Sequence, residues 1–292
     1  MPRSGILLLD KPQGLTSNQA LGRVKRRLGI RKAGHTGALD PMATGLLPLC
    51  FGEATKISAF LLDADKRYLA ELKLGVTTDS GDADGAVTAT AEVPKLDRDD
   101  LESVLTRFRG PIEQVPPMVS ALKHKGKRLH ELARAGIEVE RKPRPVTIRT
   151  LDLLNLEADR LTLRVDCTKG TYIRSLAMDI GEVLGCGAHL TALRRERSGP
   201  FDLVDAVDLA TLEAGGEDEA RTRLLPPDLA LPDRPSVDVD AEQASLLQQG
   251  QAVRSSGAPA DPVRMYCEGV FLGLGRIDEV GTLRPRRLFK LD

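Results

Sequence analysis

A single aspartate stands out among the residues whose type and setting could do chemistry. Asp40 lies in residues 34–56, GHTGALDPMATGLLPLCFGEATK, a stretch with four glycines, two prolines and few charges. An ionised carboxylate in such a structured loop can act as a nucleophile or as a general base. If the carboxylate is buried, it needs a cationic partner to stay charged. A simpler interpretation stays open, in which Asp40 is the N-cap of a helix that begins at Pro41.

The known nucleotide-binding and metal-binding motifs are absent from the sequence or incomplete. No Walker A sequence is present, and Gly185-Cys186-Gly187 lacks the third glycine of a dinucleotide-binding turn. His130-Glu131 lacks the second histidine of a zinc protease helix. The loop at residues 80–85 lacks the first carboxylate and the bidentate glutamate of a calcium loop, because Ser80 and Ala91 stand at those positions. The four cysteines form no CxxC pair. The sequence therefore predicts no metal site and no cofactor site.

The elements that must position Asp40 indicate an α+β protein. Apolar alternation and turn residues predict strands at 5–10, 66–75, 87–93, 146–156 and 160–167, and helical spacing predicts helices at 17–28, 97–108 and 171–184. Hairpins outnumber βαβ units, which favours a largely antiparallel mixed sheet with helices packed on it. Residues 213–235 combine Gly215-Gly216 with several prolines and predict a linker. The short apolar stretches that follow predict a small β-rich module.

Composition places the chain among ordinary soluble globular proteins. It has 292 residues, 41% of them hydrophobic and 29% charged, which suits one large domain or two smaller ones. No apolar run approaches the roughly 18 residues that cross a membrane, and the apolar stretch near the N-terminus is too short for a secretory signal. Together with the unpaired cysteines, this favours the cytoplasm.

The charges are balanced in total but unevenly distributed. The 42 lysines and arginines equal the 42 aspartates and glutamates. Residues 21–33 nevertheless hold six basic residues and no acid, residues 123–144 hold eight basic residues, and residues 284–290 add four more. These segments could form one positive face for a nucleic acid, or several separate solvated faces. Charge alone leaves both interpretations open.

Four blocks in a fixed order resemble the TruB family of pseudouridine synthases, the bacterial tRNA pseudouridine-55 synthases. The blocks are residues 7–21, 34–56, 63–85 and 167–195, and the resemblance extends over roughly residues 5–200. It implies the pseudouridine synthase fold and the isomerisation of uridine 55 in the tRNA T loop to its C-glycoside. It also implies that no metal or organic cofactor takes part and that the base is flipped into a pocket.

The same resemblance assigns the reacting residues. The family's catalytic aspartate corresponds to Asp40, its active-site tyrosine to Tyr68 and its active-site arginine to Arg174. Arg174 would keep Asp40 ionised, and Tyr68 would stack on the base and assist deprotonation through its hydroxyl. Whether Asp40 attacks the substrate or abstracts a proton from the sugar stays open.

Further residues match family positions that contact the substrate or support the site. They are His35 and Tyr172 in the substrate pocket, Leu193 against the base, Lys11 in the DKPQG block beneath the active site, and Lys56 on the RNA-facing side. Without the resemblance, Tyr68 and Leu193 would be interpreted as core residues and Arg174 as an exposed residue of a first helical turn.

The resemblance also implies domains and partners. Residues 1–235 would form the catalytic domain, with a basic insertion at about 116–145 that closes on RNA. Residues 236–292 would form a PUA-like RNA-binding module. The expected partner is the T arm of tRNA, with no membrane and no required protein partner, and the expected state is a monomer. A tRNA-folding activity could accompany the chemistry.

Three alternative functions stay open. The chain could be an RNA-binding or RNA-folding protein without chemistry, although such a protein needs neither Asp40 nor Arg174. It could belong to the guide-RNA-dependent branch of the superfamily, which works with protein partners. It could also be a glycosidase-like hydrolase, although such enzymes usually need a second carboxyl group.

Overall fold

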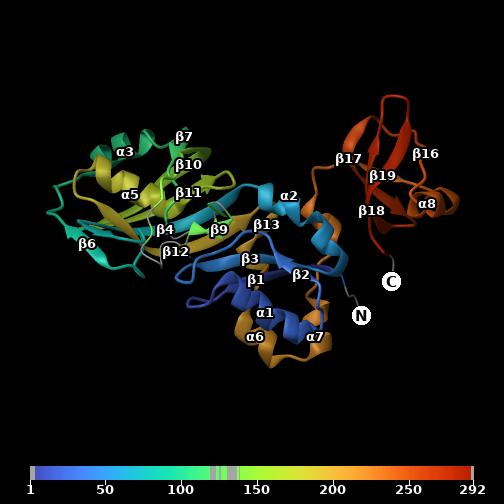
Figure 1. Cartoon of the computed structure of the whole chain (residues 1–292), viewed down its shortest axis with the longest axis horizontal. Helices are drawn as coiled ribbons and strands as arrows, with labels where there is room; N and C mark the ends of the chain where they lie inside the picture. Colours follow the sequence, from blue (N-terminus) through green and yellow to red (C-terminus); the bar gives the residue numbers. More distant parts are fainter. Residues whose placement is uncertain (1–3, 119–122, 125, 130–136, 138, 291–292) are drawn as a thin grey trace.

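The computed structural model describes residues 4–118, 123–124, 126–129, 137 and 139–290 and contains one large sheet (Figure 1). Its strand order is β14-β1-β3-β12-β4-β11-β10-β7, with β2 beside β3 and β13 beside β12. The strands are β1 Gly5–Lys11, β2 Ala33–His35, β3 Thr44–Phe51, β4 Lys66–Leu74, β7 Gly110–Gln114, β10 Arg144–Glu157, β11 Arg160–Cys167, β12 Ala188–Ser198, β13 Phe201–Asp202 and β14 Val207–Asp208. The pairs β1–β14 and β3–β12 are parallel, and the other described pairs are antiparallel. The predicted α+β class with a largely antiparallel mixed sheet is confirmed.

The central strands show two different burial patterns. β4 alternates, so that Ala70 and Leu72 are buried on one face while Glu71 between them is exposed. β1 is apolar from Ile6 to Leu9, and both faces of this stretch are covered. Ile6 and Leu8 belong to one apolar cluster, whereas Leu7 and Leu9 belong to another.

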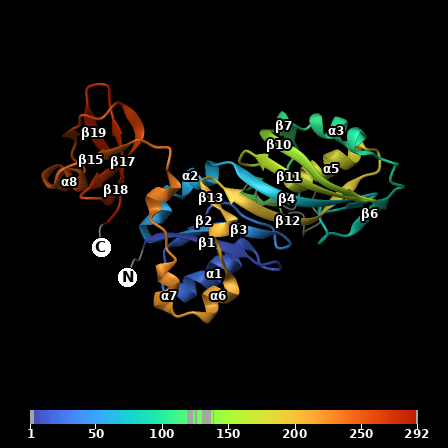
Figure 2. The same ribbon diagram turned by 180° about the vertical axis from the view of Figure 1, so that it is seen from behind.

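Helices flank the sheet in two groups (Figures 1 and 2). The first group holds α3 Arg98–Thr106 and α5 Ile173–Val183, and the second holds α1 Ser17–Leu28 with α6 Leu209–Ala214 and α7 Glu217–Thr222. α1 begins after Thr16, whose side chain accepts from the Gln19 backbone in a capping box. It ends at Gly29, which takes the left-handed conformation (φ 63°) that glycine favours at this position. Between β3 and β4 lie η1 Gly52–Ile57 and α2 Ser58–Asp63.

The predicted linker at 213–235 is wrong. This segment forms the end of α6, then α7 and the 3₁₀ helix η3 Pro227–Ala230. Ala220 and Leu224 are buried in the main core, and Glu213 pairs with Arg23 of α1. The prediction was wrong because glycines and prolines dominate the local composition. The packing of α6 and α7 on α1 depends instead on a few apolar residues that contact α1 only in the folded chain. This docking also neutralises part of the basic segment 21–33.

The C-terminal part is a five-stranded sheet, in the order β15-β17-β18-β19-β16, that confirms the predicted small β-rich module. Its elements are β15 Ser236–Asp238, α8 Ala241–Gln248, β16 Val253–Arg254, β17 Ala260–Cys267, β18 Val270–Ile277 and β19 Thr282–Leu288. The module has its own core, and Leu274 and Phe289 join the apolar cluster that contains Ile6 of β1. The division at 235/236 into a catalytic domain and an RNA-binding module stays a prediction.

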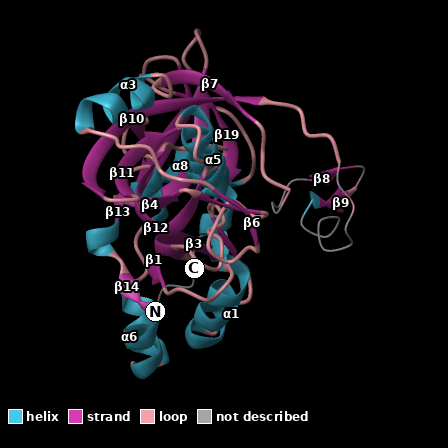
Figure 3. Cartoon of the chain, turned by 90° about the vertical axis from the view of Figure 1, so that its left-hand side faces the viewer, coloured by secondary structure: helices cyan, strands magenta, loops and turns pink. Residues whose placement is uncertain are grey.

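Two small two-stranded sheets lie outside the large sheet. β5 Val76–Thr78 and β6 Val87–Thr90 carry the loop of Asp82 between them. The predicted RNA-closing insertion at about 116–145 lies partly outside the described residues. Its described part includes β8 Lys123–His124 and β9 Lys127–Arg128, which stand apart from the sheet in Figure 3. Among the described residues, no helix is long and apolar enough to cross a membrane.

Candidate active site

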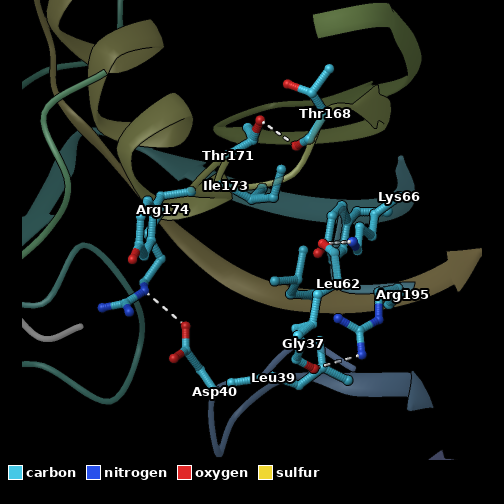
Figure 4. Close-up of a pocket in the computed structure, with 15 residues that line it drawn as sticks. Gly37, Leu39, Asp40, Leu62, Lys66, Thr168, Thr171, Ile173, Arg174 and Arg195 are labelled. Atoms are coloured by element: carbon cyan, nitrogen blue, oxygen red, sulfur yellow. Dashed lines mark hydrogen bonds and ion pairs between the residues drawn. The ribbon is translucent and has the colours of Figure 1, made fainter. Parts of the chain in front are cut away.

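A cavity of about 290 Å³ opens where the loop before β3 meets β4, β12 and the start of α5 (Figure 4). Its lining consists of Gly37, Ala38, Leu39, Asp40, Leu62, Lys66, Tyr68, Thr168, Gly170, Thr171, Tyr172, Ile173, Arg174, Leu193 and Arg195. Five residues expected at the site are in this set, namely Asp40, Tyr68, Tyr172, Arg174 and Leu193. Residues far apart in the sequence thus line one cavity.

Asp40 lies in a turn and not at the start of a helix. The backbone N–H of Ala43 donates to the Asp40 carbonyl at 3.1 Å, and β3 follows directly at Thr44. The N-cap interpretation is therefore wrong. The turn is held in place from α1, because the Ser17 hydroxyl accepts from the Leu39 N–H at 2.7 Å and donates to the Leu39 carbonyl at 3.1 Å. The Asp40 carboxylate is thereby free of any capping role.

Arg174 holds the Asp40 carboxylate at the cavity wall. Its Nε lies 3.0 Å from Oδ2 of Asp40 and 3.5 Å from Oδ2 of Asp82, and its Nη1 donates to the Ser80 carbonyl at 3.0 Å. The Arg174 side chain is 3% exposed, whereas that of Asp40 is 41% exposed toward the cavity. Figure 4 shows the Asp40–Arg174 ion pair at one side of the cavity. The carboxylate is therefore both accessible and paired with a buried charge.

Several charges act on the Asp40 carboxyl at once. Burial raises its pKa above the ordinary value, and Arg174 opposes this shift by attracting the ionised form. The like charge of Asp82 raises the pKa further, and Lys11 lowers it. Asp40 is thus a carboxylate whose protonation depends strongly on its neighbours, as is common at functional sites.

Tyr68 and Leu193 form the apolar part of the cavity. Tyr68 lies on β4, two residues before buried Ala70, and pairs in register with Arg195 of β12. Leu193 of β12 pairs with Ala70 and is itself buried. Burial raises the pKa of the Tyr68 hydroxyl above its ordinary value. An aromatic ring and a leucine on neighbouring strands offer a surface for one flat apolar ring.

The remaining expected residues lie at different distances from the cavity. Lys11 is fully buried under the Asp40 turn and donates through Nζ to the carbonyls of Pro12 at 2.8 Å and Leu15 at 2.7 Å. Burial lowers the pKa of Lys11 to about 8. His35 lies on β2 and is absent from the cavity lining. Lys56 pairs with Glu53 and donates to the Leu288 carbonyl, so it lies where the C-terminal module meets η1.

Sequence reasoning missed three charged residues of the site. Asp82 is the second carboxylate on Arg174, Lys66 lines the cavity, and so does Arg195. Lys66 donates through Nζ to three carbonyls at the end of α2, at 2.6 to 3.1 Å. The available signal was spacing, because Lys66 and Arg195 stand two residues from Tyr68 and Leu193, and alternate strand residues share a face. Among the described residues, no group of three or more side chains could hold a metal ion.

Comparison with known proteins covers nearly the whole chain. Residues 25–173 match the N-terminal domain of TruB family pseudouridylate synthases, residues 174–232 match the tRNA pseudouridylate synthase B C-terminal domain, and residues 235–289 match the C-terminal domain of pseudouridine synthase II TruB. The chain is 57% identical over 284 residues to tRNA pseudouridine synthase B of Aromatoleum aromaticum, covering 97% of this chain and 92% of the relative. It is 55% identical to the protein of the same name from Dechloromonas aromatica, covering 98% and 96%.

Solved structures agree with these matches. A Cbf5-Nop10-Gar1 complex contains a chain that is 28% identical, with a TM-score of 0.72, covering 96% of this chain and 80% of that one. An H/ACA RNP bound to a substrate RNA containing 2′-deoxyuridine contains a chain that is 25% identical, with a TM-score of 0.73, covering 98% and 85%. The chain belongs to the TruB family of pseudouridine synthases.

Proposed function

We propose that this chain is a tRNA pseudouridine-55 synthase that isomerises one uridine of the T loop without a metal or an organic cofactor. The observation that carries the proposal is the Asp40 carboxylate, exposed to a cavity and paired with buried Arg174. Tyr68 and Leu193 line the same cavity. The curated relatives named tRNA pseudouridine synthase B support tRNA as the substrate.

The proposed chemistry begins at Asp40. Its ionised carboxylate attacks the substrate or abstracts a proton from the sugar, and Arg174 stabilises that ionised form. The bond between N1 of uracil and C1′ of ribose breaks, the base rotates, and a bond between C5 and C1′ forms. N1 gains a proton and C5 loses one, so the reaction is balanced without any co-reactant. In this proposal the Tyr68 hydroxyl assists the deprotonation at C5.

The base reaches this cavity only outside the RNA stack. Extruding a nucleotide costs on the order of a few kcal/mol, which contacts to the extruded base and to phosphates offset. The Tyr68 ring and Leu193 would contact the uracil, and Tyr172 lies at the adjoining wall. Gln114 holds the backbone of Tyr172 from both sides, donating to its carbonyl at 3.3 Å and accepting from its N–H at 3.0 Å. The cavity wall is therefore preorganised for one base.

The RNA outside the cavity would meet basic segments. We propose that the T arm contacts the insertion at about 116–145 and the module from residue 236 onward, and that a monomer acts in the cytoplasm without a protein partner. His35 remains a proposed residue of the substrate pocket, and Lys56 remains a proposed contact on the RNA-facing side. Binding to phosphates predicts affinity that falls steeply with salt. A tRNA-folding activity is a further proposal, separable because it needs no carboxylate at Asp40.

The test is product mapping on an unmodified tRNA transcript incubated with purified protein alone. The proposal predicts one pseudouridine, at position 55, and none on a matched transcript with cytidine at that position. Free uracil as the product would indicate a hydrolase instead. Tight binding without any product would indicate a binding protein or a missing partner, and pseudouridine at other positions would contradict the T-loop assignment.

A further inference from the structure

The cavity holds a second buried arginine. Arg195 lies on β12 and is 1% exposed. Its Nε donates to the Leu46 carbonyl of β3 at 2.6 Å, and its Nη2 donates to the Gly37 carbonyl at 3.1 Å, as Figure 4 shows for Gly37. Among the described residues, no carboxylate forms an ion pair with Arg195. Burying a guanidinium that is bound by neutral carbonyls and not by a carboxylate is unfavourable for stability, which suggests that the charge has a function in the cavity.

Inside the cavity the Arg195 charge acts on the hydroxyl of Tyr68 and on the neighbouring ammonium of Lys66. Tyr68 and Arg195 are register partners on adjacent strands, and both line the cavity. Arg195 lowers the pKa of the Tyr68 hydroxyl and so opposes the effect of burial, whereas Cys167 and Asp40 raise that pKa. Arg195 is therefore the favourable electrostatic partner of this hydroxyl among the charged and titratable groups around it.

We infer that Arg195 is a positioning residue, fixed by the carbonyls of Leu46 and Gly37, that holds the Tyr68 hydroxyl at the cavity wall toward a uracil bound beside Asp40. The inference rests on the proposed function for the identity of the base. A guanidinium suits this role because its planar fork of donors can bind two carbonyls and still present its charge to a third oxygen. Lysine at this position would keep the charge but lose the fork.

The titration of Tyr68 in the free protein tests this directly. The chain has three tyrosines and no tryptophan, so replacement by a fluorinated tyrosine gives a simple ¹⁹F NMR spectrum. Fluorination also lowers the pKa of a phenol, so the titration moves to lower pH. Tyr172→Phe and Tyr266→Phe assign the resonances. The perturbations are Arg195→Gln and Arg195→Lys, each checked for folding by circular dichroism.

We expect Arg195→Gln to move the Tyr68 titration upward by on the order of one pH unit or more, and Arg195→Lys to move it less. If Arg195→Gln fails to fold, Arg195→Lys alone decides. The matched control is Arg194→Gln, on the same strand but 40% exposed and paired with Asp10, which should leave the titration unchanged. An unchanged Tyr68 titration in the folded Arg195 variants would overturn the inference. Because no RNA is present, this result is independent of whether the proposed function holds.

Discussion

Replacing Asp82 by asparagine should lower the free energy of unfolding and should shift the acid limb of the pH–rate profile to lower pH. Oδ1 of Asp82 accepts from the Ser80 hydroxyl at 2.5 Å and from the Asp84 N–H at 3.1 Å, while Oδ2 faces Nε of Arg174 at 3.5 Å. Asp82→Asn can keep the first oxygen and put an NH₂ group against Arg174. The change therefore removes the contact with Arg174 and a negative charge while leaving the local loop bonds in place.

The first consequence is a loss of stability. Arg174 is buried, and after the substitution it keeps its contacts with Asp40 and the Ser80 carbonyl but loses one of its two carboxylates. The new amide NH₂ group would also face a buried cation, and losing a hydrogen bond to a charged group costs about 1.5–3 kcal/mol. We expect the free energy of unfolding in urea to fall by about 2 kcal/mol. The exposed neighbour Asp84 is the matched control, and Asp84→Asn should change it by less than about 0.5 kcal/mol.

The second consequence is a shift of the acid limb of the reaction to lower pH. The carboxylate oxygens of Asp40 and Asp82 lie 3.0 and 3.5 Å from the same nitrogen and so at most 6.5 Å apart. Two like charges at that distance repel by roughly 0.6 kcal/mol in water and 2.6 kcal/mol at an effective dielectric of about 20. Removing this repulsion lowers the pKa of Asp40, because the like charge of Asp82 raises it. The exposure of Asp40 to the cavity favours the smaller repulsion.

The assay is the single-turnover release of tritium from RNA that carries [5-³H]uridine, measured across pH. In the wild type the acid limb reflects Asp40 beside the negative charge of Asp82, and in Asp82→Asn it reflects Asp40 without that charge. The reasoning is refuted if the limb of the variant stays in place or moves to higher pH. It is also refuted if stability is unchanged, because Arg174 would then not depend on Asp82.

Further predictions concern stability and binding. Burial lowers the pKa of Lys11 and of Lys66 to about 8 from the ordinary value of 10.5. Between these two pH values the unfolded chain binds more protons than the folded chain. The contribution of the two lysines to the free energy of unfolding in urea should therefore rise with pH. Lys66→Met should flatten this rise. It should also lower the free energy of unfolding by about 2 kcal/mol or more at neutral pH, because three carbonyls lose their donor. The control Lys169→Met, at an exposed lysine, should lower it by less than about 1 kcal/mol. Thr16→Ala should cost about 1 kcal/mol by removing the capping box of α1, with no change in the rate of the bound RNA's reaction. Truncation from residue 236 should weaken tRNA binding more than chemistry, and unchanged affinity would contradict an RNA-binding role for the module.

Local pattern predicted most of the elements that position the site. The alternation of β4 placed Tyr68 on the buried face, and helical spacing placed α1 and α5 within one or two residues of their observed ends. The pairing of Asp40 with Arg174 was predicted from the resemblance alone, because no local pattern shows that residues 134 positions apart in the sequence are in contact.

Other features of the site and of the fold were not predicted from the sequence. Lys66 and Arg195 were missed because their partners are backbone carbonyls, which every residue supplies, so no complementary acid marks them. The segment 213–235 was predicted as a linker because glycine and proline indicate loops, while its helices depend on contacts with α1. Tertiary packing overrides local composition in both cases.

The central claim is that Asp40 starts the reaction, and Asp40→Asn tests it most directly. The substitution keeps the size of the side chain and removes the charge. The measurement is the single-turnover formation of pseudouridine in an unmodified tRNA transcript, alongside the Kd of the same complex. The account predicts a Kd within about threefold of the wild type and no detectable pseudouridine, because the nucleophile or base is lost. Pseudouridine formed by Asp40→Asn at a rate within about tenfold of the wild type would contradict it.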